Sequence, residues 1–161
     1  MNTLKLWIEK AHPVIQLAFR LLLAWVFIES GCEKLRHLDH FLITAQSYKV
    51  LPPGITYFYA VCVPWFEMLA GLYLLLGLFR RFAAGLTGAL LVSFLIALAI
   101  VLIRGDVIDC GCYVGGKSEP VSWELFARDT LFLLMCVYLY FSPSLPLSLD
   151  SLLAPPPEKT A

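Results

Sequence analysis

Two long apolar segments, 57–78 and 82–103, follow one another in the chain with only a short turn, 77–81, between them. A helix needs about 20 apolar residues to cross the hydrocarbon core of a bilayer. Two such segments so close together predict a pair of antiparallel membrane-crossing helices. The whole chain is 60% hydrophobic and only 15% charged, which excludes an ordinary soluble domain.

Two further apolar segments, 14–30 and 125–141, extend the same pattern. A crossing helix satisfies its own backbone hydrogen bonds, as the hydrocarbon requires. We therefore expect an all-α membrane protein: a four-helix transmembrane bundle over 13–142 with both termini on the same side. Residues 1–12 are expected to form an interfacial segment, and 143–161 a disordered tail.

Membrane lipid is the expected surrounding of the apolar segments, and the charged residues indicate no further partner. Twelve basic and twelve acidic residues give a formal net charge of zero, and no basic patch predicts a nucleic-acid partner. Basic residues are nearly balanced between the two sides of the expected bundle, so they do not fix its orientation. Paired thiols usually work in an oxidising compartment, which favours an extracytoplasmic cysteine loop and cytoplasmic termini.

That cysteine loop, Asp109-Cys110-Gly111-Cys112-Tyr113, connects the last two apolar segments. Two cysteines in three positions indicate a redox pair, a static disulfide or a soft-metal site. A disulfide between them closes a small ring, strained disulfides are more oxidising, and Gly111 tolerates the turn. We favour redox-active thiols and assign no metal site, because the chain has neither a Cys-x-x-Cys motif nor a histidine-rich tract.

The remaining cysteines have different expected roles. Cys32 follows the first apolar segment, and Cys62 lies about 8 Å into the second, on the same membrane face as the loop. Cys32 is therefore a possible third thiol, either paired with one loop cysteine or acting as a resolving thiol. Cys136 lies far along the fourth segment and is expected to be an apolar filler.

Two charged residues lie within the expected membrane region, Arg20 and Glu67. An unpaired charge there costs about 2.5–3.5 kcal/mol on insertion scales. An Arg20–Glu67 ion pair is the expected structural solution, and Glu67 could also relay protons or hold a polar head group. The neighbouring Trp65 and Phe66 could stack on a quinone ring, although packing or lipid contact is the simpler alternative for each.

Several short motifs, in this order and spacing, resemble the MauE/DoxX-type redox-associated membrane proteins. They are Gly31 with Lys34-Leu35, Tyr48 with Leu51-Pro52, Pro64-Trp65-Phe66-Glu67 with Gly71, Gly77 before Arg80, the cysteine loop, and Val121-Ser122 followed by Arg128-Asp129. Two departures are a loop one residue longer than the family's Cys-Gly-Cys-Phe-Gly, and a cysteine at position 32.

The resemblance implies a four-helix bundle of bacterial inner membranes. MauE-like proteins are associated with disulfide formation during maturation of methylamine dehydrogenase, and DoxX-like proteins with quinone-linked sulfur or thiol metabolism. Similar bundles with cysteines at one face, in the DsbB and vitamin K epoxide reductase groups, pass electrons from thiols to a quinone.

Three functional hypotheses follow. In the first, Cys110 and Cys112, with Cys32 as a third thiol, exchange disulfides with a periplasmic thioredoxin-like or thiol substrate protein. Electrons then pass to a quinone held near Cys62, Trp65, Phe66, Glu67 and Arg20. The second is a non-enzymatic assembly factor or subunit. The third is a small transporter of metal or thiol cargo with Arg20 and Glu67 on its path.

Overall fold

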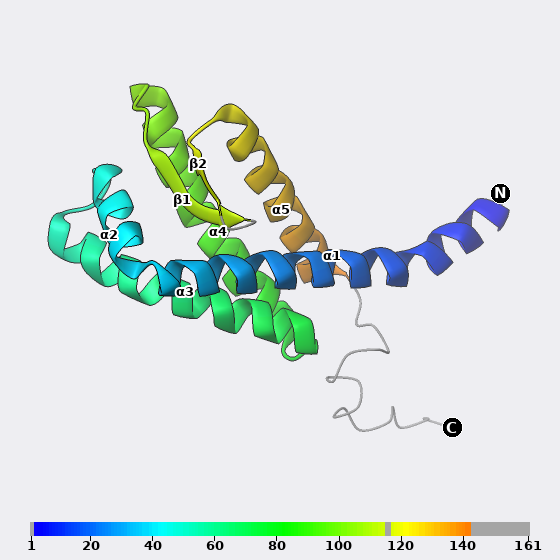
Figure 1. Ribbon diagram of the computed structural model, residues 1–161. Coiled ribbons are helices and arrows are strands. Elements are labelled where there is room, and N and C mark those ends of the chain that lie inside the picture. Colours follow the sequence, from blue (N-terminus) through cyan, green and yellow to red (C-terminus); the bar gives the residue numbers. More distant parts are fainter. Residues whose placement is uncertain (1, 115–116, 143–161) are drawn as a thin grey trace.

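A computed structural model describes residues 2–114 and 117–142 of the chain. In order, its elements are α1 (Asn2–Arg36), α2 (Leu38–Ser47), α3 (Pro53–Leu76), α4 (Arg80–Arg104), β1 (Asp109–Val114), β2 (Lys117–Pro120) and α5 (Trp123–Phe141). The part of the chain described is thus mainly helical, as expected (Figure 1). The tail expected to be disordered lies outside the described residues.

Glycine and proline set the helix boundaries. Pro53 occupies the first turn of α3, where its missing N–H costs nothing, and Gly77 ends the helix in the left-handed conformation at φ 68°. Gly105 ends α4 in the same way, at φ 72°. Pro13, in contrast, lies inside α1, so this helix runs without a break from residue 2 to residue 36. The interfacial position of residues 1–12 stays a prediction.

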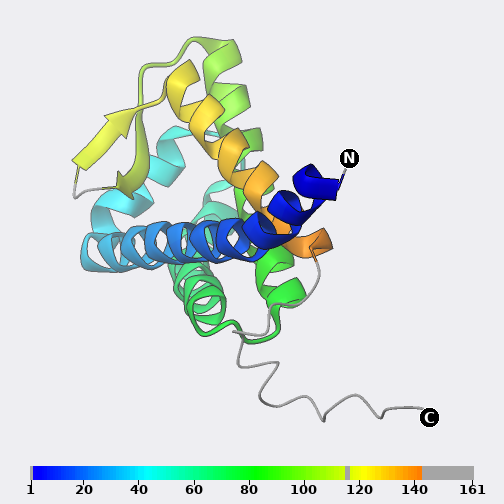
Figure 2. The same cartoon turned by 90° about the vertical axis from the view of Figure 1, so that its right-hand side faces the viewer.

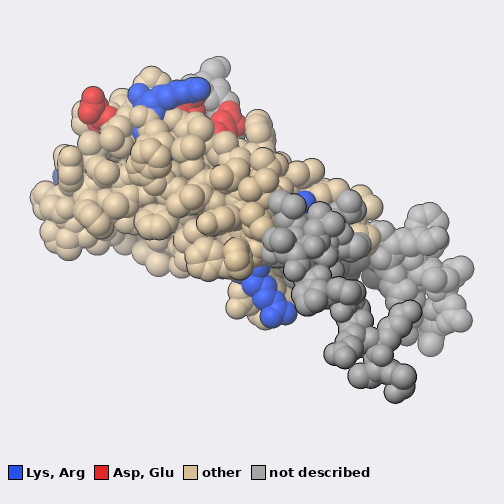
Figure 3. Space-filling model, turned by 90° about the horizontal axis from the view of Figure 1, so that it is seen from below, with Lys and Arg blue, Asp and Glu red and all other residues tan. Residues whose placement is uncertain are grey.

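Three helices in the described part of the chain are long and apolar enough to cross a membrane. These spans are Pro13–Arg36 in α1, Pro53–Leu76 in α3 and Arg81–Arg104 in α4. Helix α5 has 19 residues, but Glu124, Arg128 and Asp129 lie among them and it is not one of the three. The fourth crossing therefore remains a prediction. Figure 3 shows a broad surface without charged groups, bounded by charges at two edges.

The closest helix packing joins α1 to α3, which lie side by side in both views (Figures 1 and 2). A Cβ added to Gly31 would lie 2.9 Å from the Pro64 carbonyl oxygen, and one added to Gly71 would lie 3.1 Å from that of Ala24. Small residues allow helix backbones to approach this closely in lipid. The two glycines thereby fix the register of α1 along α3.

The small residues of α4 also pack against a helix. A Cβ on Gly85 would be 3.8 Å from Tyr140, and one on Gly88 would be 3.8 Å from Leu133, which are ordinary contacts with α5. Cys136 of α5 is 2% exposed in the apolar cluster between these helices, which confirms it as a filler.

The cysteine segment forms a β-hairpin, which the sequence analysis did not predict. Strands β1 and β2 pair antiparallel, with Asp109 opposite Pro120 and an irregularity before Tyr113. The hairpin rests on α1 and α2 (Figure 2). A second apolar cluster contains Cys110 and attaches the hairpin to helices α4 and α5. Its buried members are Tyr48, Leu98, Val101, Cys110 and Leu125.

Candidate functional site

Cys110 lies on strand β1 of the hairpin, with only 1% of its surface exposed, and it is disulfide-bonded. The Tyr48 hydroxyl donates a hydrogen bond of 2.8 Å to the Cys110 carbonyl oxygen. Arg104 in turn donates to the Tyr48 carbonyl oxygen at 3.0 Å. The backbone at Cys110 is therefore held by the segment after α2, and that segment is held by the end of α4.

Gly111 brings the hairpin close to α2. Its φ is +68°, a conformation that side chains with a Cβ rarely adopt. An added Cβ would also lie 3.2 Å from atoms of both Phe41 and Thr44. Glycine at this position thus allows both the turn and the close approach.

The other cysteines do not pair with Cys110. Cys32, Cys62 and Cys136 are free thiols, so the alternative in which Cys32 is bonded to a loop cysteine is wrong in this structure. The side chain of Cys112 lies outside the described residues. Cys32 and Cys62 are both half-buried, and neither lines the two cavities described below.

A cavity of about 270 Å³ lies between α1, α2, α3, α4 and β1. Its walls are mostly apolar and aromatic, with a few polar groups. The lining includes Lys34, Phe41, Tyr48, Tyr59, Glu67, Ser93, Phe94 and Cys110. The cavity therefore touches both the disulfide-bonded cysteine and a charged pair deep in the helices. Pockets for small molecules have this composition, and their volumes begin at about 300 Å³.

The charged pair is Lys34 with Glu67, and the expected Arg20–Glu67 pair is wrong. Lys34 Nζ lies 2.5 Å from Glu67 Oε1, and the two side chains are 3% and 11% exposed. Helix α1 continues past the expected end of the first span, and the contact of Gly31 with Pro64 and Met68 brings Lys34 level with Glu67. Arg20 lies almost four turns before Lys34 on α1 and cannot reach Glu67.

The aromatic walls surround the ammonium group of this pair. Lys34 Nζ lies 5.2 Å from the ring centroid of Phe41 and 5.8 Å from that of Phe94. Cations are attracted to ring faces at these distances. Glu67 Oε2 is buried and has no hydrogen-bond partner among the described residues. One acceptor therefore remains open beside the cavity.

Arg20 is a separate buried cation. It is 6% exposed, and its Nε and Nη1 atoms have no hydrogen-bond partner among the described residues. It lines neither of the two cavities. The structure therefore does not bring Arg20 to the site with Glu67.

Trp65 and Phe66 also lie away from the cavity, on the outer face of α3. Their exposed fractions are 58% and 48%. Val63 and Glu67 are four residues apart and share the inward face, so the residues between them point elsewhere. The structure supports the simpler alternative of lipid contact for both rings.

Sequence patterns alone do not assign Lys34, Tyr48, Tyr59 or Phe94 to the site. Lys34 and Tyr48 belong to the motifs quoted above, and that was the available signal for them. Tyr59 and Phe94 carry no local signal, because aromatic residues are common in apolar helices. The Tyr59 and Ser93 hydroxyls are 2.8 Å apart and join α3 to α4 at the cavity wall.

Tyr48 lies outside the three spans, and its environment favours the neutral phenol. Burial raises the pKa of Tyr48, and the negative charges of Asp129 and Asp109 raise it further. The phenol therefore remains protonated at physiological pH and available to donate to the Cys110 carbonyl.

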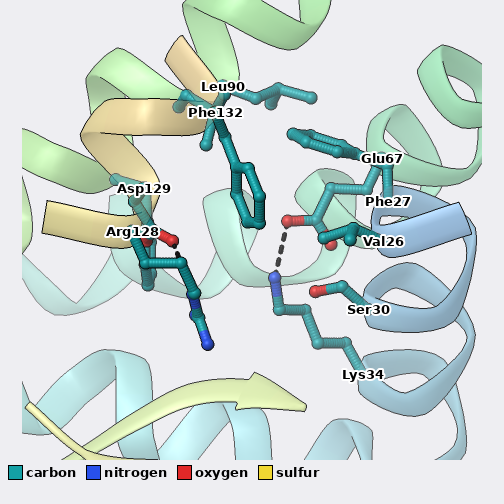
Figure 4. Close-up of a pocket in the computed structure, with 11 residues that line it drawn as sticks. Val26, Phe27, Ser30, Lys34, Glu67, Leu90, Arg128, Asp129 and Phe132 are labelled. Carbon is teal, nitrogen blue, oxygen red and sulfur yellow. Dashed lines mark hydrogen bonds and ion pairs between the residues drawn. The ribbon is translucent and has the colours of Figure 1, made fainter. Parts of the chain in front are cut away.

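A second cavity of about 50 Å³ adjoins the same charged pair. Figure 4 shows Lys34 and Glu67 pointing toward one another on one side, and Arg128 and Asp129 of α5 on the other. Arg128 Nε lies 3.3 Å from Asp129 Oδ1, and Asp129 is 4% exposed. In the described part of the chain, no group of three histidine, cysteine or acidic residues could hold a metal ion.

Comparison with known proteins shows the family of the chain. The family model described as methylamine utilisation protein MauE matches residues 12–142. The MauE proteins of Paracoccus denitrificans and Methylorubrum extorquens are 35% and 34% identical over 119 and 120 residues, or 73% and 74% of this chain. Each alignment spans 64% of the relative's own length. No solved structure matches the chain significantly. The resemblance is thereby confirmed: the chain belongs to the MauE family of membrane proteins.

Proposed function

We propose that this chain is a membrane thiol–disulfide protein that supports disulfide formation in an extracytoplasmic partner. The Cys110 disulfide, with Cys112 as its second sulfur, would oxidise two thiols of that partner. The electrons would then pass to a quinone in the 270 Å³ cavity. The relatives are named for methylamine utilisation, and we propose the same setting for this chain.

One observation carries the proposal: a single cavity is lined both by Cys110 and by the buried Lys34–Glu67 pair. A static disulfide would need no cavity beside it. A buried ion pair is also weak support for stability alone, because desolvation of the two charges offsets much of their attraction. A redox reaction at Cys110 would account for both the cavity and the buried ion pair beside it.

The residues present fit a quinone. Such a group, when bound, accepts two electrons and two protons. Phe41, Phe94 and the other apolar walls would exclude water and contact a flat ring. Lys34 would present a positive charge to a carbonyl oxygen, while Glu67 orients its ammonium group. Tyr48 holds the Cys110 backbone at the same wall.

The same proposal includes a fourth crossing by α5. This helix exposes Leu131, Leu134 and Phe141, an apolar outer face suited to lipid. Four crossings would put both termini on one side of a bacterial inner membrane and the hairpin on the other. We propose that the hairpin side is extracytoplasmic, because paired thiols usually work in an oxidising compartment, and a periplasmic thioredoxin-like protein could reach it there. Cys32 lies two residues before Lys34 on α1 and therefore faces away from the cavity side, so we leave it out of the relay.

The experiment is a spectrophotometric assay of quinone reduction. Purified protein is mixed with dithiothreitol and a short-chain ubiquinone. The cavity variant is Ala97→Phe, which adds a ring at the cavity wall. Its matched control is Ala99→Phe on the same helix, which lines neither cavity. We expect the parent and Ala99→Phe to reduce the quinone above the uncatalysed rate, and Ala97→Phe and Cys110→Ser to lose that activity. A parent protein without activity, or an Ala97→Phe variant as active as the parent, would contradict the proposal.

A further inference from the structure

The small cavity lies between the buried Lys34–Glu67 pair and the part-buried Arg128–Asp129 pair. Its polar lining comes from three helices: Ser30 and Lys34 of α1, Glu67 of α3, and Arg128 and Asp129 of α5. Helix α4 contributes only the apolar Leu90, Leu91 and Phe94, so no charge from α4 faces the cavity. Figure 4 shows the two pairs approaching the same space from opposite sides.

This cavity is suited to water. A buried water needs about 10–15 Å³ of accessible volume and two to four polar partners. The cavity offers about 50 Å³ and is bordered by the Ser30 hydroxyl, the Lys34 ammonium and two carboxylates. Glu67 Oε2 is buried with no hydrogen-bond partner among the described residues, so a water there would satisfy it.

The polar groups continue from this cavity in both directions. Lys34 and Glu67 line the small and the large cavity alike. At the other end, Arg128 Nη1 lies 3.5 Å from Glu119 Oε2 on β2, and the Glu119 side chain is 58% exposed. A series of ionisable groups therefore leads from water at the hairpin to the large cavity.

The geometry points to a proton route from the hairpin surface through Asp129 and the hydrated small cavity to Glu67 and Lys34. This route would supply the protons for quinone reduction and so rests on the proposed function. Oxidation of two thiols to a disulfide releases two electrons and two protons, and reduction of a quinone to a quinol consumes two of each. The thiols release two protons at the hairpin, and the quinone takes up two protons at the large cavity. Asp129 and Glu67 deliver these protons to the large cavity.

A labelling experiment tests the route without any redox activity. Ser30→Cys is made in full-length protein in which Cys32, Cys62 and Cys136 are replaced by alanine and the hairpin disulfide stays oxidised. A charged methanethiosulfonate reagent is added to membranes. We expect Cys at position 30 to be modified, because water reaches it. The control is Thr87→Cys, at a fully buried position that lines neither cavity, which should stay unmodified. Equal lack of reaction at both positions would overturn the inference.

A kinetic experiment tests whether the route carries protons. Asp129→Asn should slow quinone reduction about 10²-fold, the scale of a lost proton-transfer group, and a small weak acid such as formate should restore part of the rate. Asp129→Glu should retain activity. The control is Asp106→Asn, an exposed aspartate near the hairpin, which should have the parent rate.

The two experiments separate the failures. A full parent rate in Asp129→Asn, or a loss that no weak acid restores, would overturn the proton route while leaving the proposed electron transfer intact. A parent protein without quinone reduction would refute the proposed function, and the labelling result would still decide whether water reaches the small cavity.

Discussion

Replacing the Lys34–Glu67 pair separates what this pair does for stability from what it does for function. With its nitrogen and oxygen 2.5 Å apart, the pair is worth about 7 kcal/mol of Coulomb energy at an effective dielectric constant of 20. Desolvation of the two ions costs several kcal/mol each and cancels most of this energy. The intact pair should therefore contribute little net stability, although a single remaining charge would be expensive.

We accordingly expect Lys34→Met and Glu67→Met each to lower the free energy of unfolding by about 3–5 kcal/mol, because each leaves a buried charge without its partner. The double variant Lys34→Met/Glu67→Met should recover most of that loss. At about 2–4 °C per kcal/mol for a chain of this size, each single variant should lower Tm by about 6–20 °C.

The assay is thermal unfolding in detergent, followed by the fluorescence of the four tryptophans. Quinone reduction is measured on the same samples. We expect the double variant to be stable and inactive, which would show that the pair is retained for its chemistry. Additive losses of Tm in the double variant would refute the reasoning, since they would mean that the two charges do not compensate one another. A stable double variant with full activity would refute the role in the site.

Three further predictions concern packing around the site. Gly111→Ala should destabilise the protein by about 1–2 kcal/mol, because position 111 has a positive φ and an added Cβ would contact Phe41. The control Gly54→Ala should not destabilise it, because an added Cβ there has no atom within 4 Å. Thermal unfolding measures both variants. Gly71→Ala should cost about 1–3 kcal/mol by forcing α1 from α3, and Gly85→Ala, 3.8 Å from Tyr140, should cost much less by the same measurement. The raised pKa of Tyr48 means that its contribution to stability is complete below the unfolded pKa of about 10 and is lost as pH rises above that value. Tyr48→Phe should remove this alkaline loss in unfolding curves measured at increasing pH, and an unchanged loss would contradict the assignment.

The sequence pattern is sufficient to predict the apolar helices and to select Cys110 as a candidate, because long apolar segments and closely spaced cysteines are local signals. It was not sufficient for the hairpin. Strands β1 and β2 have only six and four residues, and their packing depends on contacts with α2 and α4 that no local pattern records.

The partner of Glu67 could not be predicted for a similar reason. The sequence placed Lys34 beyond the membrane and Arg20 within it, so Arg20 was the natural choice. The choice depends on the register of α1 along α3, which is set by the contacts of Gly31 and Gly71. Trp65 and Phe66 adjoin Glu67 in sequence and are therefore predicted to lie beside it, but neighbours on a helix point in different directions.

The most direct measurement is the thiol state of Cys110 in intact membranes, followed by a maleimide gel shift. The control is Cys110→Ser, and Cys32→Ser tests one of the free thiols on the same side. We expect the disulfide to be oxidised at rest, to be reduced by a dithiol, and to re-form only when a quinone is present, in the parent and in Cys32→Ser alike. A disulfide that resists reduction throughout, or that re-forms equally well without a quinone, would contradict the account.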